Sequence, residues 1–329
     1  MFTRAEYDAA AGIVYEHMQP TLQHAWPLLR DELGCEVWLK HENQTPLGAF
    51  KVRGGLVHMR RRRAAGHLNG VITASTGNHG QSIPNAARIE GIEATVVVPQ
   101  NNSAEKNAAM RALGARLIET GTDFADAVAY ARHLADDEGL DMIPSFHGDL
   151  VQGVATYAHE LFTAAGDLEV VYVPIGLGSG ICGVIGMRDM LGLRTRVVGV
   201  VAHGANAYAL SFKAGHAVPT NTAATFAEGV AVREPNAQAL EVIAAGADDV
   251  IEVSDAEIRA AVRLIYRATH NLAEGAGAVA LAAVMQDRAR LQGQRVAAIL
   301  SGGNIDAHKF AAILTEQPEE PAHDPQQLS

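Results

Sequence analysis

The chain has 329 residues, 48% of them hydrophobic and 19% charged, a balance typical of a globular protein with about two domains. The formal net charge of −11 argues against nucleic acid and anionic membranes as partners, because both need a basic surface, and favours a small-molecule substrate. No run approaches the ~20 apolar residues of a membrane span. Two cysteines, Cys35 and Cys182, are too few for a disulfide framework, so we expect a cytoplasmic protein.

Short β-branched runs alternate with longer segments of helical periodicity. The predicted strands cover residues 36–40, 70–75, 94–99, 115–119, 169–176, 196–202, 250–253 and 295–303. One predicted helix begins with the capping-box pair Ser254 and Glu257. Its apolar stripe consists of Ile258, Val262 and Ile265. Strands that are apolar on both faces and separated by helices favour mostly parallel sheets covered on both sides.

The alternation of strands and helices restarts after about residue 145, where the segment 142–153 contains one proline and two glycines. We therefore expect an α/β protein with two doubly wound, mostly parallel sheets in two domains. The smaller domain is expected at 68–145, inserted into a larger domain formed by 1–67 and 146–315. Residues 316–329 are rich in proline, glutamine and acid and are expected to form a flexible tail.

The segment VVYVPIGLGSGICGVIGMRDM (170–190) predicts a strand, a glycine-rich turn and a helix. Backbone N–H groups in such a turn, together with the helix dipole, favour a phosphate-binding site. Gly178, Gly180 and Gly183 also have the G-x-G-x-x-G spacing of a dinucleotide site, so a nicotinamide-dependent oxidoreductase stays open as an alternative. That fingerprint expects an acidic residue at the end of the next strand, where this chain has His203.

Two other predicted strands end in turns rich in serine, glycine and asparagine, TASTGNHGQS (73–82) and ILSGGNID (299–306). Open α/β sheets bind their ligands at the carboxyl ends of the strands. Three polar turns from distant parts of the chain therefore predict one convergent site.

Lys51, one of five lysines in the chain, lies between Phe50 and Val52 and is followed by Gly54 and Gly55. The segments HENQTPLGAFKVRGG (41–55), STGNHGQS (75–82), VPIGLGSG (173–180), FAEGVAV (226–232) and LSGGNID (300–306) together resemble the serine/threonine dehydratase family of pyridoxal-phosphate enzymes. That family has the tryptophan-synthase-β-type fold, fold type II. The resemblance implies pyridoxal 5'-phosphate as cofactor, joined to Lys51 as a Schiff base.

Physical chemistry supports this role of Lys51. An amine must be neutral to attack an aldehyde, and burial beside Phe50 and Val52 lowers the pKa of a lysine. A guanidinium group is never deprotonated, which explains why the residue is lysine and not arginine. The resemblance implies two catalytic residues, Lys51 as the base and Thr76, which stands where amino-acid racemases of this family have a serine.

The resemblance also implies the binding residues. Those expected to bind the cofactor are Phe50, Lys51, Asn78, Gly176, Leu177, Gly178, Ser179, Gly180 and Ser301. Residues 176–180 would hold the phosphate, Ser301 the pyridine nitrogen and Asn78 the phenolic oxygen. The substrate carboxylate is expected at Ser75, Thr76, Gly77, Asn78 and His79.

The implied reaction is β-elimination from a β-hydroxy-α-amino acid, giving a 2-oxo acid and ammonia. The substrate would be threonine or serine, or a bulkier compound such as phenylserine, for which Leu47, 145–149 and 227–234 would line a roomier pocket. An amino-acid racemase and a β-replacement enzyme of the cysteine-synthase kind stay open as alternatives. We expect a homodimer.

We expect no metal site. Some relatives bind a divalent ion through acids at the positions of Val201 and Ala207, neither of which can be a ligand here. The zinc motif H-E-x-x-H is also absent from the sequence.

Overall fold

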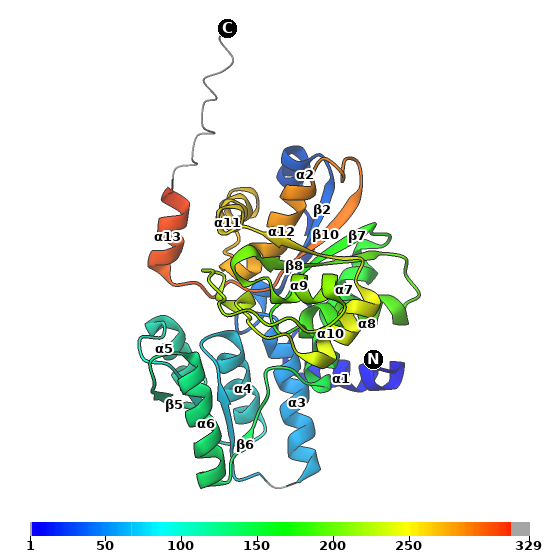
Figure 1. The fold of residues 1–329 in the computed structure, drawn as a ribbon. Helices are drawn as coiled ribbons and strands as arrows, with labels where there is room; N and C mark the ends of the chain where they lie inside the picture. Colours follow the sequence, from blue (N-terminus) through cyan, green and yellow to red (C-terminus); the bar gives the residue numbers. More distant parts are fainter. Residues whose placement is uncertain (1, 67, 317–329) are drawn as a thin grey trace.

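The computed structural model describes residues 2–66 and 68–316, which form two sheets surrounded by helices (Figure 1). The strands are β1 (Gln23–Ala25), β2 (Glu36–His41), β3 (Val71–Ala74), β4 (Ala94–Val98), β5 (Ala115–Glu119), β6 (Asp141–Met142), β7 (Val170–Pro174), β8 (Arg196–Ala202), β9 (Asp249–Val253) and β10 (Arg295–Leu300). The α-helices are α1 (Arg4–His17), α2 (Pro27–Leu33), α3 (Lys51–Ala65), α4 (Asn78–Ile89), α5 (Ala104–Ala112), α6 (Phe124–Glu138), α7 (Gly148–Ala165), α8 (Ser179–Met190), α9 (Ala207–Ala214), α10 (Ala237–Gly246), α11 (Asp255–Thr269), α12 (Gly275–Asp287) and α13 (Ala307–Thr315).

The strands form one six-stranded sheet, in the order β1-β2-β10-β7-β8-β9, and one four-stranded sheet, in the order β5-β4-β3-β6. Neighbouring strands are parallel except β1, which pairs antiparallel with β2. In Figure 1 the four-stranded sheet lies with α4, α5 and α6 in the lower part of the molecule, and the six-stranded sheet lies above it. The predicted α/β fold with two mostly parallel sheets is confirmed.

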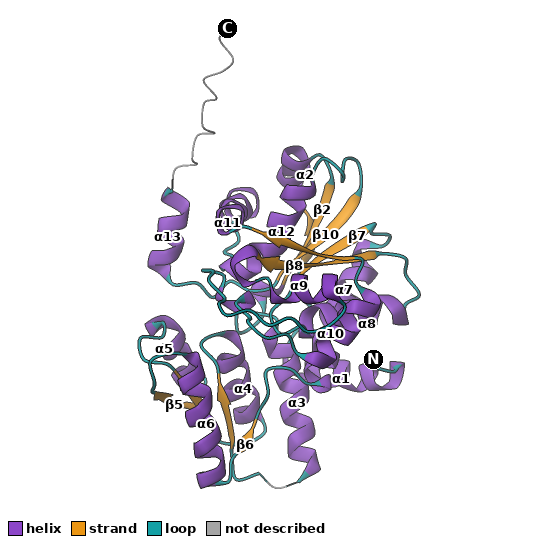
Figure 2. Ribbon diagram, in the orientation of Figure 1, coloured by secondary structure: helices purple, strands orange, loops and turns teal. Residues whose placement is uncertain are grey.

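Helices cover both faces of the six-stranded sheet (Figure 2). Successive side chains of a strand point to opposite faces, so each strand contributes to two cores. In β10, Val296 and Ala298 belong to the core that contains residues of α2, α11 and α12. Ala297 and Ile299 belong to the other core, with residues of α7, α8 and α10.

The four-stranded sheet is also covered on both faces. Ile72 and Val97 pack against α6 on one face. On the other face, Val71 packs in a core with residues of α4, α3 and α1, and Val96 packs against α5. Helices α1 and α3 precede the predicted small domain in the chain and yet share a core with its sheet. The domain boundaries at 67/68 and 145/146 stay a prediction.

All eight predicted strands are present, to within three residues at their ends. The strands β1 and β6 were not predicted, because runs of 3 and 2 residues are too short to show a periodicity. The capping box of α11 is confirmed, since Ser254 Oγ accepts a hydrogen bond from the N–H of Glu257 at 3.2 Å and the Glu257 carboxylate accepts one from the N–H of Ser254 at 2.7 Å.

The predicted tail 316–329 lies outside the described residues, apart from Glu316. Within residues 2–66 and 68–316, no helix combines the length and the apolar character that crossing a membrane requires.

Candidate active site

The carboxyl ends of β3, β7 and β10 meet the start of α3 around a cavity of about 150 Å³. All thirteen predicted site residues line this cavity: Phe50, Lys51, Ser75, Thr76, Gly77, Asn78, His79, Gly176, Leu177, Gly178, Ser179, Gly180 and Ser301. The structure thus brings together the three polar turns and Lys51, as the sequence predicted. The individual roles of these residues stay predictions.

Lys51 is the first residue of α3, and the backbone before it is tied to the end of β10. The N–H of Phe50 donates to the carbonyl of Ser301 at 3.1 Å. The amine of Lys51 lies 3.5 Å from Ser179 Oγ and 5.1 Å from the centre of the Phe50 ring. No carboxylate of the described residues pairs with it, and burial lowers the pKa of Lys51 to about 8. A substantial fraction of this amine is therefore neutral in mildly alkaline solution.

The glycine-rich turn after β7 leads into α8, whose N-cap is Gly178 with φ of 101°. A side chain at this position would be strained, and a Cβ there would lie 2.6 Å from Ala239 Cβ. A Cβ on Gly176 would lie 2.4 Å from the carbonyl oxygen of Gly229. The described part of the chain supplies no side-chain cap for α8, so the N–H groups of its first turn are free to bind an anion.

The turn after β3 begins with Ser75, whose Oγ accepts hydrogen bonds from the N–H groups of Gly77 and Gly80 at 3.4 and 3.0 Å. Asn78 begins α4 and donates to Glu274 Oε1 at 2.6 Å, while its Oδ1 accepts from Asn304 at 2.8 Å. The Asn78 side chain is therefore held in one orientation at the cavity wall.

His79 is 6% exposed, and its Nε2 has no hydrogen-bond partner among the described residues. Burial lowers the pKa of His79 to about 3, so its ring is neutral at pH 7. A neutral, buried ring with one unpaired nitrogen is suited to forming the wall of a ligand site.

Ser301 follows β10 directly and is also buried. Its hydroxyl donates to the carbonyl of Ala276 at 3.2 Å. Among the described residues no carboxylate bonds to this hydroxyl, and its contact with the pyridine nitrogen of the cofactor stays a prediction.

The sequence analysis missed two ionisable residues of the cavity, Lys106 and Glu274, and named a third, Glu228, only as part of the segment 227–234. Lys106 Nζ lies 2.5 Å from Glu228 Oε2, so these two charges pair. Glu274 is 8% exposed, and burial raises its pKa to about 7. Glu228 lies in the segment FAEGVAV, which carried the resemblance, whereas Glu274 comes from AEGAGA (273–278), an alanine- and glycine-rich stretch that also fits an ordinary packed helix.

The expectation of a roomier pocket is only partly met. Glu228, Gly229 and Val230, from the predicted segment 227–234, line the cavity. Leu47 and residues 145–149 do not: Leu47 packs against the core between α1, α3 and β3.

Comparison with known proteins identifies the class of this site. Residues 14–302 match the family described as "Pyridoxal-phosphate dependent enzyme". The chain is 33% identical over 284 residues to an L-threo-3-hydroxyaspartate ammonia-lyase of a Pseudomonas species, covering 86% of this chain and 89% of that protein. It is 32% identical over 290 residues to an L-threonine ammonia-lyase of Thermotoga maritima, covering 88% of this chain and 72% of that protein.

A solved structure agrees with these relatives. The processed form of threonine deaminase isoform 2 from Solanum lycopersicum is similar with a TM-score of 0.87 and 29% identity, covering 96% of this chain and 95% of that one. The chain therefore belongs to the family of pyridoxal-phosphate-dependent enzymes, with fold type II, and is related to the serine/threonine dehydratases.

The residues of the cavity fit pyridoxal phosphate. Lys51 offers an amine with a lowered pKa and no carboxylate partner in the described chain, and the first turn of α8 offers free N–H groups for a phosphate. The unpaired Nε2 of the buried His79 is a third polar group that faces no protein partner. Since the family uses this cofactor, the nicotinamide alternative for the glycine-rich turn is not supported.

Proposed function

We propose that this enzyme is an ammonia-lyase that eliminates water from a β-hydroxy-α-amino acid and, after hydrolysis of the enamine product, yields a 2-oxo acid and ammonia. The observation that carries the proposal is the pair of ionisable groups, Lys51 and Glu274, in one cavity. Burial lowers the pKa of the lysine to about 8 and raises that of the glutamate to about 7. One group can thus accept a proton and the other can donate one near neutral pH, which an elimination requires. The two related ammonia-lyases support the same class of reaction.

Pyridoxal phosphate, when bound, supplies an aldehyde that links to amines and a ring that withdraws electrons from the Cα–H bond of an amino acid. Residues 176–180 would hold its phosphate, Phe50 would lie beside its ring, and Asn78 and Ser301 would contact its ring substituents. The N–H groups at the start of α4, with the hydroxyls of Ser75 and Thr76, would bind the substrate carboxylate.

Two residues of the chain would move protons. Neutral Lys51 Nζ takes the proton from the substrate Cα. Protonated Glu274 gives its proton to the β-hydroxyl group, so that water leaves instead of hydroxide. The hydrogen bond between Asn78 and Glu274, of 2.6 Å, holds the carboxyl group in place. The enamine product then hydrolyses in water to the 2-oxo acid and ammonia.

An assay of 2-oxo acid and ammonia release tests the proposal. Threonine, serine, 3-hydroxyaspartate and phenylserine are supplied one at a time, without any added nucleophile. We expect equal amounts of 2-oxo acid and ammonia from at least one of them. A β-replacement enzyme would release product only when a thiol is added. The proposal of a bulky substrate fails if threonine is turned over far faster than phenylserine.

Racemisation is a second candidate, because the hydroxyl-bearing residue Thr76 lines the same cavity as Lys51. A racemase needs a second proton-carrying group besides the lysine. Thr76 keeps the hydroxyl group of the serine found in racemases, but it carries an additional methyl group that restricts the side chain. Chiral chromatography of serine after incubation with the enzyme would reveal the D-enantiomer. In a Thr76→Ala variant we expect racemisation to be lost while elimination persists.

We further propose a cytoplasmic homodimer. Both cysteines are free and buried, which suits a reducing compartment. Large apolar side chains are exposed on several elements, including Leu28, Phe124 and Tyr266. Light scattering of the purified protein would give the mass of the assembly.

A further inference from the structure

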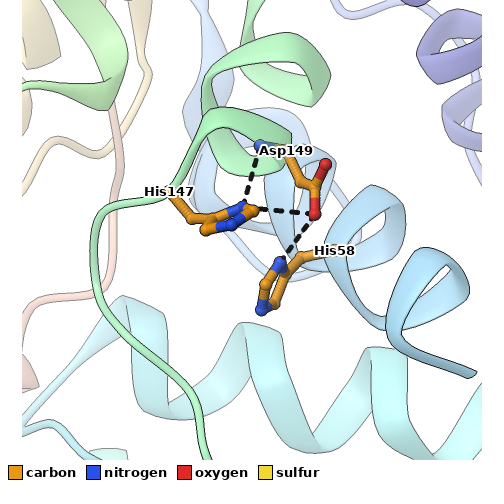
Figure 3. Close-up of side chains that lie close together, drawn as sticks. All are labelled: His58, His147 and Asp149. Carbon is orange, nitrogen blue, oxygen red and sulfur yellow. Dashed lines mark hydrogen bonds and ion pairs between the residues drawn. The ribbon is translucent and has the colours of Figure 1, made fainter. Parts of the chain in front are cut away.

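A second group of ligating side chains lies away from the cavity, where α3 meets the start of α7. His58 comes from α3, and His147 and Asp149 come from the N-terminus of α7 (Figure 3). One nitrogen of each histidine and one carboxylate oxygen lie within 4.8 Å of one another. His58 and Asp149 are 91 positions apart in the sequence, so no motif spacing could reveal the group.

The spacing of these atoms suits a small divalent ion. His58 Nδ1 lies 3.0 Å and His147 Nδ1 lies 3.2 Å from the same oxygen, Asp149 Oδ2. Metal–ligand distances of about 2.0–2.1 Å at tetrahedral angles place neighbouring ligand atoms about 3.3 Å apart. A metal ion can therefore bind His58 Nδ1 and Asp149 Oδ2 with only small movements of the side chains. To bind His147 Nδ1 as well, the His147 ring has to turn its one lone pair from the N–H of Asp149, now at 3.1 Å, to the ion.

The contact between His147 and Asp149 places two acceptors face to face. His147 Nδ1 accepts a hydrogen bond from the backbone N–H of Asp149 at 3.1 Å, so it carries a lone pair and no proton. Asp149 Oδ2, 3.2 Å away, is also an acceptor. Two lone pairs at this distance repel each other unless a cation lies close to both.

Arg61 orients the carboxylate for this role. Its Nη1 donates to the other oxygen, Asp149 Oδ1, at 2.5 Å and to Gln152 Oε1 at 2.7 Å. Metal-binding carboxylates are commonly held in this way by a further hydrogen bond. The arginine leaves Oδ2 directed at the two histidines.

We propose that His58, His147 and Asp149 form a binding site for a divalent transition ion of the zinc type, which joins α3 to α7. Two imidazole nitrogens and one carboxylate oxygen, with water as a fourth ligand, match the preference of zinc. Calcium and magnesium need six or more oxygen ligands, which this group does not offer. The site departs from the expectation, drawn from the sequence, that the protein has no metal site.

Zinc titration of the holoenzyme, produced without a polyhistidine tag, tests the site. Isothermal titration calorimetry should show one zinc ion per chain for the wild type and binding at least about tenfold weaker for His147→Asn. Asparagine is a good helix N-cap, so this variant keeps the cap of α7 and removes only the ligand nitrogen. A His58→Phe variant, with circular dichroism as a check of folding, should also lose the site.

A matched control is His133→Asn on α6, where an exposed histidine lies 2.8 Å from Asp137 as a simple pair. This variant should bind zinc as the wild type does. Zinc binding that is equal in the wild type and His147→Asn, or that falls equally in His133→Asn, overturns the proposal. Magnesium added at the same concentration should produce no heat of binding.

Discussion

Lys51 and Arg53 lie two residues apart in the first turn of α3, but their surroundings shift their pKa values in opposite directions. Arg53 is fully buried and bonds to Glu42 and Glu160, each at 2.7 Å. Burial alone would lower the pKa of Arg53, but the two carboxylates raise it above its usual value. Lys51 has no such partner in the described chain, so burial alone acts on it and lowers its pKa to about 8.

Lys40 extends the network around Arg53. Its Nζ lies 2.5 Å from Glu160 Oε2 and also donates to Thr21 O and Gln23 Oε1, at 2.8 and 2.7 Å. Two cations and two carboxylates thus neutralise each other at the start of α3, the helix that carries both Arg53 and Lys51. The difference shows that the presence of acidic partners, more than depth of burial, decides whether a buried cation is structural or reactive.

The largest expected effect is the loss of catalysis in Lys51→Ala. We expect kcat/KM to fall by about 10³-fold or more, because the amine that attaches the cofactor and takes the Cα proton is gone. Lysine is required rather than a positive charge, so Lys51→Arg should be as inactive. Thermal unfolding of both variants should resemble that of the wild type, and substantial activity in either would contradict the role of Lys51.

Removal of Arg53, the paired cation of the same helical turn, should lower the stability of the fold. Arg53→Met leaves two carboxylates buried with one remaining cation, and we expect the free energy of unfolding to fall by about 3–5 kcal/mol in urea titrations. Arg63→Met, at an exposed position near the end of the same helix, is the control and should change it by less than about 0.5 kcal/mol. Equal losses of unfolding free energy in the two variants would show that the buried ion pairs of Arg53 do not stabilise the fold more than an exposed arginine does.

Replacement of the proposed acid should have a smaller effect on catalysis. In Glu274→Gln we expect kcat to fall by about 10²-fold, because the amide keeps the contact with Asn78 but cannot donate the proton to the leaving hydroxyl. The wild-type carboxyl is protonated below its pKa of about 7 and Lys51 is neutral above its pKa of about 8, so kcat should be highest between these two values and decline as pH rises above 8. That decline should vanish in the variant; if it persists, another group is the acid.

The smallest effect concerns the rate at which the cofactor-free protein takes up pyridoxal phosphate. Only the neutral amine reacts, and with a pKa of about 8 the neutral fraction of Lys51 rises as pH increases through 8. The rate measured by absorbance should therefore be about tenfold lower at pH 7 than well above pH 8. A rate independent of pH between 7 and 9 would mean that the amine is already neutral or that another step limits uptake.

Much of the site could be predicted from the sequence, because each of its turns follows an apolar strand and is rich in glycine together with serine or asparagine. Such a combination at the carboxyl end of a strand is typical of a ligand-binding turn. Ser75 and Ser301 are examples, since they directly follow β3 and β10, and Gly178 lies in the turn between β7 and α8. Glu274 and Lys106 could not be found in this way. Their role in the cavity depends on tertiary packing that brings α12 and α5 to it, and a single charged residue in a helical segment is more often exposed to solvent.

The fold was predictable for similar reasons. Its prediction was incomplete where an element forms only through contacts with residues distant in the sequence. Eight strands have enough β-branched residues to be recognised, but β1 and β6 form only through pairing with β2 and β3. The shared core of α1, α3 and the four-stranded sheet joins residues such as Val14, Leu56 and Val71 from three distant segments. No local pattern indicates such long-range packing.

The most direct measurement is to reduce the cofactor-loaded enzyme with borohydride and to locate the pyridoxyl group by peptide mass spectrometry. The chain offers five lysines, of which Lys40, Lys51 and Lys106 are buried or line the cavity. The account predicts modification of Lys51 alone, since the amines of Lys40 and Lys106 are bound to carboxylates. A pyridoxyl group on any other lysine, or none on the purified coloured protein, would contradict it.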